Sequence, residues 1–362
     1  MSRPRFSYYL EHATGRVPID ESKLDVALEA AQFEEVRRGR RVLTTNPPPE
    51  LRVVPQWHRV DGRPRVEALA VHASDREAPI VVCSVRSIIV RPESTRGIPV
   101  DVHSGERSEV GEVRVLAFES PTAALPEDRA PFEEEFQFEE IAEPIPVIAL
   151  GLDSLALERQ EAPRRNDDRF PVFVPRRVLD EIVDLKRRAG SVETGGLLIG
   201  HLARDPREGT IFAVVAAQIP ARHAVAEPMR LSFTEATWTA ARAAMTLRGR
   251  GEIVLGWHHT HPARVWCRDC PRERWPECPL AQDFFSAADE DVHRAVTPKA
   301  FGFALVCGDR VTTAGDWTDS HAMFGWRDGE IVRRPFMVLE AEPVLPATTS
   351  SPVLPPNEGE DA

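Results

Sequence analysis

The sequence contains no long apolar segment, and this absence excludes two classes of protein. None of its 362 residues belongs to a stretch that approaches the ~20 apolar residues of a membrane-spanning helix. The N-terminal segment MSRPRFSYYLEHATG also lacks the apolar run of a secretory signal. We therefore expect a cytoplasmic protein without a membrane partner.

Basic residues are outnumbered by acidic residues. The chain has 45 Lys and Arg against 57 Asp and Glu, a formal net charge of -12. Phosphate backbones and anionic lipid surfaces repel such a chain, which disfavours general binding to nucleic acids or membranes. We expect no nucleic-acid partner.

The five cysteines are an odd number and do not follow the pattern of a disulfide scaffold. Cys83 and Cys307 lie in separate apolar segments, where a thiol usually packs as a small hydrophobic side chain. Cys267, Cys270 and Cys278 instead fall within twelve residues, and the first two have the C-x2-C spacing of a zinc hairpin. This cluster favours metal or redox chemistry.

Composition divides the chain into four segments. Residues 1–118 combine a helical pattern over 20–41 with strand-like runs, which predicts a small α+β domain of unknown role. Residues 119–168 are acidic and proline-rich, as in a linker. Residues 169–340 form a compact pattern, and 341–362 predict a disordered tail.

In the compact segment, helical and strand patterns alternate. An amphipathic helix is predicted over 174–190, and two strands follow in GGLLIGHL and TIFAVVAAQIP. Thr234 is a candidate N-cap for a second helix, and a third begins near Ser286. The strands EIVLGWHHTH and KAFGFALVCGD precede and follow the third helix. The fold class is therefore α/β (α+β), with helices packed on a sheet.

The end of the strand EIVLGWHHTH carries the strongest chemical signal. Residues i and i+2 of a strand face the same side, so His259 and His261 can converge on one ion while His258 points away. Two imidazoles supply half of a tetrahedral zinc shell.

Asp289 and Glu193 can complete a site around this pair, one as a ligand and one as a base. Ser286 and Asp289 are three residues apart at a helix start and so share a helix face. Asp289 would complete a His₂Asp shell with one position open for water. The same Ser-x-x-Asp pattern is equally typical of a capping box. Glu193, in ETGGLLIG, is the candidate base because it follows a helix and precedes a buried strand.

The segments ETGGLLIG, GWHHTHP and SAAD resemble, in this order, the motif of the JAMM (MPN+) zinc metallopeptidases. The resemblance covers roughly residues 170–340 and implies a JAB/MPN-like curved β-sheet flanked by helices, with one catalytic Zn²⁺. It also implies that three residues bind zinc, that Glu193 is the general acid/base and that Ser286 stabilises the oxyanion. The three implied ligands are His259, His261 and Asp289.

Members of this family hydrolyse the peptide or isopeptide bond after the C-terminal glycine of ubiquitin or a ubiquitin-like protein. For this chain the resemblance implies deconjugation or maturation of a ubiquitin-like protein. The arginine-rich composition suggests a high-GC bacterium. For such a source the resemblance implies a bacterial ubiquitin-like conjugation system, with activating and conjugating enzymes as partners. The alternatives are a peptidase that trims a sulfur-carrier protein in thiocarboxylate or cysteine metabolism, and a non-catalytic MPN scaffold.

This sequence departs from the family pattern in one respect, since 24 residues separate His261 from Ser286. Loops tolerate such length at small entropic cost. The Cys-rich insertion, residues 263–285, carries Cys267, Cys270 and Cys278, and three thiolates with a fourth ligand would form a second, structural zinc site. Redox-active or unligated cysteines are the alternatives. Three histidines are candidates for the fourth ligand: His201, His258 and His293.

Overall fold

The computed structural model describes eight stretches of the chain: residues 5–12, 15–48, 50–60, 63–85, 114–120, 143–155, 170–227 and 230–341. These residues divide into two compact units, Met1–Pro144 with Arg327–Glu330, and Ile145–Trp326 with Ile331–Ala362. Most of the predicted linker (121–142 and 156–168) and of the predicted tail (342–362) lies outside the described residues. Within the described part of the chain, no helix has both the length and the apolarity needed to cross a membrane.

The first unit contains two three-stranded antiparallel sheets and one α-helix among its described residues. One sheet has the order β2-β1-β6, from β1 (Arg5–His12), β2 (Gly15–Pro18) and β6 (Arg114–Ser120). The other has the order β3-β4-β5, from β3 (Arg52–Val60), β4 (Arg63–His72) and β5 (Val81–Ser84).

The predicted helix over 20–41 corresponds to η1 (Glu21–Leu24) followed by α1 (Asp25–Arg37). Its buried apolar residues include Ala27 and Ala31, which pack in one core with Leu69 of β4 and Cys83 of β5. Cys83 is fully buried, as a hydrophobic thiol would be.

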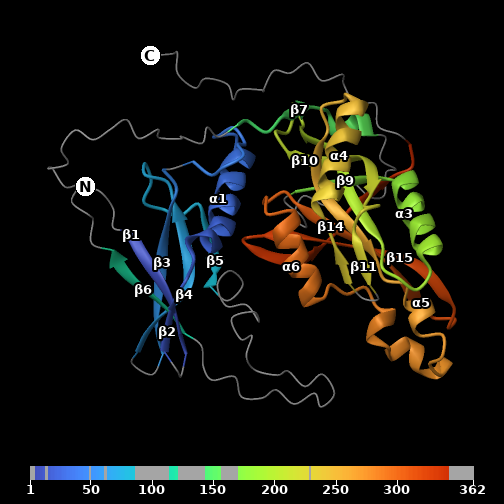
Figure 1. Cartoon of the computed structure of the whole chain (residues 1–362). Helices are drawn as coiled ribbons and strands as arrows, with labels where there is room; N and C mark the ends of the chain where they lie inside the picture. Colours follow the sequence, from blue (N-terminus) through green and yellow to red (C-terminus); the bar gives the residue numbers. More distant parts are fainter. Residues whose placement is uncertain are drawn as a thin grey trace. The chain divides into compact units, whose positions relative to one another are not determined.

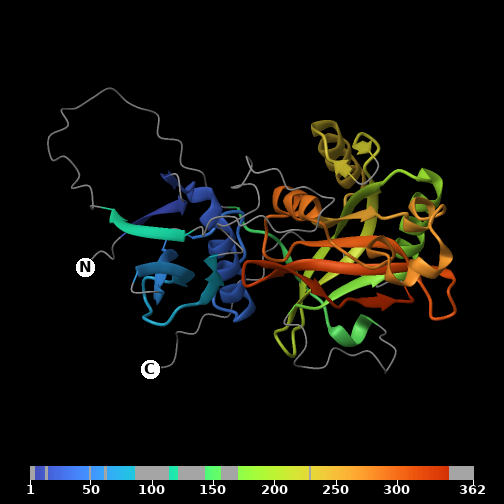
Figure 2. The ribbon, with the colours of Figure 1, turned by 90° about the horizontal axis from the view of Figure 1, so that it is seen from below.

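The second unit is built on a nine-stranded sheet with the order β16-β15-β14-β13-β9-β10-β8-β17, and β7 pairs in addition with β9. Figure 1 gives the arrangement of each unit, and Figure 2 shows β14 and β15 running side by side in the view from below. The strands are β7 (Val147–Ala149), β8 (Val172–Pro175), β9 (Gly195–Arg204), β10 (Ile211–Pro220), β13 (Ile253–Thr260), β14 (Phe303–Val311), β15 (Trp317–Arg327), β16 (Glu330–Arg334) and β17 (Met337–Leu339). A separate two-stranded ribbon joins β11 (Val225–Glu227) and β12 (Arg230–Ser232).

Helices cover both faces of this sheet (Figure 1). On one face, Trp257 of β13 packs in a cluster with Ala241 of α4 (Glu235–Arg248) and Val292 of α6 (Ala287–Val296). On the other, α3 (Arg176–Ala189) buries Val178, Leu179 and Ile182. Register shifts in β10 and β13 mark bulges, which bend and twist a sheet. The predicted fold class, a curved sheet flanked by helices, is confirmed.

Two predicted helix ends are also present. Thr234 is the N-cap of α4, and its hydroxyl accepts a hydrogen bond from the Thr237 amide at 3.3 Å. Gly190 follows α3 with φ 70°, a backbone region that favours glycine. Within α3, Lys186 is buried and the neighbouring apolar residue Leu185 is only half-buried.

Part of the predicted linker belongs to the second unit. Residues 147–155 form β7, which pairs in parallel with β9, and η3 (Leu152–Leu155). Leu150 and Leu155 are buried against Phe212 of β10, so this short apolar run extends the core of the sheet. Proline and acidic residues on both sides of the run hid it in the sequence.

Candidate metal centre

The two motif histidines lie side by side at the end of β13. The Nε2 atoms of His259 and His261 are 3.0 Å apart, and both side chains are buried. His259 stacks on Trp257 at a centroid distance of 4.7 Å, and His261 stacks on Phe284 at 4.3 Å. Neither Nδ1 has a hydrogen-bond partner among the described residues, so aromatic stacking fixes the orientation of the two rings.

His258, between them, points to the opposite face of the sheet. Its Nε2 lies 3.3 Å from Gln218 Oε1, and the Gln218 amide in turn donates to Glu181 of α3. The alternation of a β-strand therefore separates His258 from the pair, as predicted.

Asp289 approaches the histidine pair from the first turn of α6. Its Oδ1 is 3.2 Å from His259 Nε2, and its Oδ2 is 3.8 Å from His261 Nε2. The Ser286 amide and hydroxyl both donate to Oδ2, at 2.7 and 2.8 Å, and the Asp289 amide donates back to Ser286 Oγ at 3.1 Å. One carboxylate thus closes a capping box with Oδ2 and faces the histidines with Oδ1, so the two interpretations of Ser-x-x-Asp hold together.

The spacing of these donor atoms fits a zinc ion. In a tetrahedral shell with bonds of about 2.0–2.1 Å, neighbouring ligand atoms are about 3.3 Å apart. The observed 3.0 Å between the two Nε2 atoms and 3.2 Å from His259 Nε2 to Asp289 Oδ1 are close to this value. Within the described residues, His259, His261 and Asp289 are the one group of metal-ligating side chains whose ligand atoms all lie within 4.8 Å of one another.

Strand register brings Glu193 to the same place. β9 pairs antiparallel with β13, with Gly195 opposite His259 and Gly196 opposite His258. Continued by two residues, this register sets Glu193 opposite His261, and the Thr194 amide donates to Thr260 Oγ1 at 3.0 Å. Glu193 Oε1 lies 3.7 Å from His261 Nε2. Glu193 is therefore close to the histidines, but it is not a member of the compact ligand group.

The glycine pair after Glu193 permits this close packing. A Cβ on Gly195 would lie 2.3 Å from the backbone oxygen of His258, and one on Gly196 would lie 2.3 Å from that of Ile219. Neither position accepts a side chain without movement of a neighbouring strand.

Burial dominates the electrostatics of the centre. It raises the pKa of Glu193 to about 7, with Asp289 adding to the rise and His259 opposing it. It lowers the pKa of His261 to about 3, with His259 contributing in the same direction. Burial would also raise the pKa of Asp289, but the two histidines and the Ser286 amide hold it below the usual range. These shifts leave a neutral imidazole and an anionic carboxylate, which are the forms that bind a cation.

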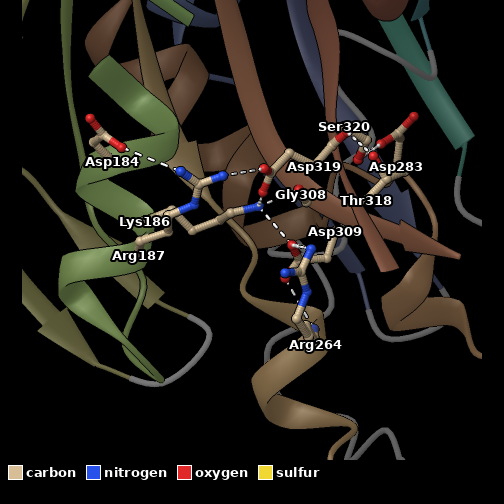
Figure 3. A network of polar contacts seen from close by, with 10 residues as sticks. All are labelled: Asp184, Lys186, Arg187, Arg264, Asp283, Gly308, Asp309, Thr318, Asp319 and Ser320. Carbon is tan, nitrogen blue, oxygen red and sulfur yellow. Dashed lines mark hydrogen bonds and ion pairs between the residues drawn. The ribbon is translucent and has the colours of Figure 1, made fainter. Parts of the chain in front are cut away.

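Figure 3 shows a buried cation, Lys186, that the sequence analysis did not identify. Lys186 Nζ, on α3, is 2.8 Å from Asp309 Oδ1 and 2.9 Å from Asp319 Oδ1, and it also donates to the Gly308 carbonyl oxygen. Asp309 Oδ2 accepts from the backbone amide of Arg264 at 3.1 Å. The network therefore ties α3 and β14 to the chain just after His261.

The insertion, residues 263–285, is anchored at several further points. Trp266 Nε1 donates to the Ser191 carbonyl oxygen at 2.9 Å, two residues before Glu193. Asp283 accepts from Ser320 Oγ at 2.7 Å (Figure 3). It also accepts from Arg333 at 2.9 Å. Trp266 and Phe284 were not recognised from sequence as neighbours of His261, because each is brought there by the insertion.

The three clustered cysteines meet within the insertion. Cys267 is buried, Cys278 is half-buried and Cys270 is exposed. The Sγ atoms of Cys267 and Cys278 are 3.5 Å apart. Burial raises the pKa of Cys267 to about 12, and contacts with Cys278 and Cys270 contribute to this rise.

None of the three histidines considered as a fourth ligand joins these thiols in a group of potential ligands. His258 contacts Gln218, and His293 Nδ1 accepts a hydrogen bond from Trp257 Nε1 at 3.1 Å. His201 is buried in β9, where Glu252 is its nearby charge. The expectation that one of them completes a cysteine site is not supported by this arrangement.

Comparison with known protein families bears on the second unit. Residues 175–265 match the family model for prokaryotic homologs of the JAB domain. This part of the second unit is therefore similar to a JAB domain. The matched residues include Glu193, His259 and His261, whereas Ser286 and Asp289 follow beyond the insertion.

Other comparisons add little to this assignment. A solution structure of a protein from Desulfitobacterium hafniense is 17% identical, with coverage of 47% of this chain and 94% of that one. Its TM-score is 0.31, so it carries no argument for fold or function. No curated protein matches the chain.

Proposed function

We propose that this chain is a zinc-dependent peptidase that cleaves the bond after the C-terminal glycine of a ubiquitin-like protein, in deconjugation or maturation. The observation that carries the proposal is the convergence of two imidazoles and one carboxylate, with a separate buried carboxylate beside them. The JAB family includes metallopeptidases, which fits this arrangement of residues.

His259, His261 and Asp289 are the proposed zinc ligands. A zinc ion held there would polarise the scissile carbonyl and lower the pKa of water to near 7. Stacking on Trp257 and Phe284 keeps both imidazoles turned toward the ion. The hydrogen bonds from Ser286 to Asp289 Oδ2 leave Oδ1 directed at the same point.

Glu193 is the proposed general acid/base. Its carboxylate accepts a proton from the attacking water and donates it to the leaving amine. A base suits this work when its pKa is close to the working pH, and burial moves Glu193 in that direction. Since the carboxylate is not a ligand in this assignment, its removal would affect proton transfer and leave the metal bound.

Ser286 is the proposed hydrogen-bond donor to the oxyanion. Its hydroxyl proton is directed at Asp289 Oδ2 in this structure, so donation to substrate requires the hydroxyl to rotate. Its positioning of Asp289 and its contact with substrate are therefore two separable contributions.

The proposed substrate class follows from the tight surroundings of the histidines. Trp266 and Phe284 both pack against His261, and His259 is fully buried. A glycine tail has no Cβ and can pass closest to a buried ion between aromatic side chains. The proposed partners are the ubiquitin-like protein or its conjugate, together with activating and conjugating enzymes.

The test combines zinc content with cleavage of fusions in which a ubiquitin-like protein ends in Gly-Gly before a reporter. We expect Glu193→Gln to retain zinc and to lose 10²–10⁴-fold in kcat, the usual contribution of a general acid/base. His259→Ala should lose the ion and activity together. As a matched control, Glu290→Gln changes a half-buried carboxylate on α6 that pairs with Arg294, and should keep both.

Two results would contradict the proposal. Cleavage by Glu193→Gln at the parental rate would remove the role of this carboxylate. A folded wild-type protein that binds no zinc and cleaves none of the fusions would indicate a non-catalytic JAB scaffold.

A further inference from the structure

The insertion between the two halves of the metal centre has almost no apolar core. Of residues 263–285, all of which are described, only Ala263, Cys267 and Ala281 are buried. Its helices are short: α5 (Ala263–Trp266), η4 (Arg272–Glu277) and η5 (Pro279–Ala281). Segments that cannot bury a core of their own are usually held by disulfides or by a structural metal.

Backbone hydrogen bonds bring the three thiols of this segment together. The Cys270 amide donates to the Cys267 carbonyl oxygen at 3.0 Å, and this turn places the two side chains of the C-x2-C pair near each other. Trp275 Nε1 donates to the Cys270 carbonyl oxygen at 3.2 Å, and the Cys278 amide donates to the Trp275 carbonyl oxygen at 3.1 Å. Trp275 thus joins the third cysteine to the turn that carries the first two.

The sulfur positions fit a metal better than a disulfide. Two thiolates on one tetrahedral zinc ion, each bonded at about 2.3 Å, are about 3.7–3.8 Å apart. The 3.5 Å between Cys267 Sγ and Cys278 Sγ is close to this distance. The Cys270 thiol is near enough to contribute to the raised pKa of Cys267, although the three sulfurs do not all lie within 4.8 Å of one another. Because Cys270 is exposed, rotation of its side chain closes the group at little cost.

We propose that Cys267, Cys270 and Cys278 bind a second Zn²⁺ ion, with a water molecule in the fourth position on the exposed side of the cluster. Thiolates are ligands that select zinc among the common divalent ions. A disulfide would use two of the three thiols and leave the third unexplained. The bound ion would hold the insertion together in place of an apolar core.

This second ion stabilises the approach to the catalytic residues. The Cys267 amide donates to the Ala263 carbonyl oxygen at 2.8 Å, and α5 begins two residues after His261. Trp266, the residue before Cys267, contacts the His261 ring and donates to the Ser191 carbonyl oxygen. A metal on Cys267 therefore orders a segment that contacts the chain next to both His261 and Glu193.

The first experiment measures zinc per chain by elemental analysis, after purification under reducing conditions and removal of free metal. We expect two ions in the wild-type protein, one in His259→Ala, one in Cys270→Ser and none in the double variant. Cys270 is exposed, so its replacement by serine leaves the buried residues in place. Arg274→Ser is the matched control, because Arg274 is exposed in the same segment and cannot bind a cation.

Cobalt substitution separates this proposal from the proposed function. In a His259→Ala background, Co²⁺ should still produce thiolate-to-metal charge-transfer absorption, and Cys270→Ser should abolish it. If the histidine site proves to bind no metal, this absorption is unaffected. If the cysteine site is wrong, the absorption is missing while zinc at the histidine site remains.

Limited proteolysis gives a third readout that does not depend on activity. Trypsin can cut at Arg268, Arg272 and Arg274, which are exposed within the insertion. We expect cleavage there to be at least tenfold faster in Cys270→Ser than in the wild-type protein. The proposal is overturned by one zinc per wild-type chain with no change in Cys270→Ser. It is equally overturned by a Cys267–Cys278 disulfide that forms in the metal-loaded protein.

Discussion

Replacement of Lys186 by methionine tests the energetics of the second unit most directly. The Lys186 side chain is 5% exposed, and its amine lies 2.8 Å from Asp309 and 2.9 Å from Asp319. Methionine has a similar length but no charge, so Lys186→Met leaves Asp309, which is 4% exposed, with only the half-exposed Arg264 guanidinium at 3.5 Å. Breaking a buried ion pair by removal of one partner costs about 3–5 kcal/mol of the free energy of unfolding.

The adjacent residue provides the control. Arg187 is 63% exposed and also pairs with Asp319, at 3.0 Å (Figure 3). Solvent screens this pair, so Arg187→Met should cost less than about 1 kcal/mol. The two substitutions remove neighbouring cations that share an aspartate, and burial is what distinguishes them.

Urea unfolding followed by tryptophan fluorescence measures both variants. Six of the seven tryptophans belong to the second unit, so the signal reports mainly on this domain. A chelator should be present throughout, because bound zinc would add its own binding energy to stability. Lys186→Met with Asp309→Asn should recover part of the loss, since an amide replaces the unpaired charge. Equal stabilities for Lys186→Met and Arg187→Met would refute the argument.

The remaining predictions concern the metal centre and the sheet. Ser286→Ala removes the side-chain N-cap of α6 and two hydrogen bonds with Asp289. Zinc affinity measured by chelator competition should therefore fall 10–100-fold. An unchanged affinity would show that Ser286 does not position Asp289 for the metal. Gly196→Ala would set a Cβ 2.3 Å from the Ile219 carbonyl oxygen and 2.6 Å from His258 Nε2. Such crowding should lower the free energy of unfolding by about 1–3 kcal/mol or more. A urea midpoint equal to that of the wild-type protein would contradict this expectation. Burial acts to raise the pKa of Asp319, but Lys186 holds it below its ordinary value. The stability that this pair provides is therefore complete above the unfolded pKa of about 3.9 and is lost as pH falls through the lower folded pKa. The free energy of unfolding of Lys186→Met should therefore depend less on pH than that of the wild-type protein, as measured by urea titrations from pH 5 to 2.

The sequence predicted which side chains the structure brings together at the candidate centre, because their placement follows local rules. Strand alternation separates His258 from the other two histidines, and the three-residue spacing of Ser286 and Asp289 follows the helix turn. Glu193 could be proposed from its motif, but its position opposite His261 depends on the pairing of β9 with β13. That pairing joins residues more than 50 positions apart, which no local pattern encodes.

Other features depended on tertiary packing. The helical pattern of α3 could not distinguish Lys186 from Leu185 as its buried residue, because the choice depends on two aspartates contributed by β14 and β15. The three strands β1, β2 and β3 have mixed composition, and they were missed. β7 was assigned to the linker because it is a strand of only three residues, too short for a recognisable strand pattern.

The architecture also explains why a long insertion between the proposed zinc ligands does not disturb their geometry. Asp289 is placed by α6, whose His293 accepts a hydrogen bond from Trp257 and whose Val292 packs in the same cluster. Trp257 is two residues before His259 on β13, so both ligands are fixed through one buried side chain and not through the connecting segment. The insertion is held at its start by Asp309, through the Arg264 amide, and at its end by Asp283. Since these ends are set by carboxylate contacts to the sheet, the length between them can vary while the histidine-to-aspartate distance stays constant.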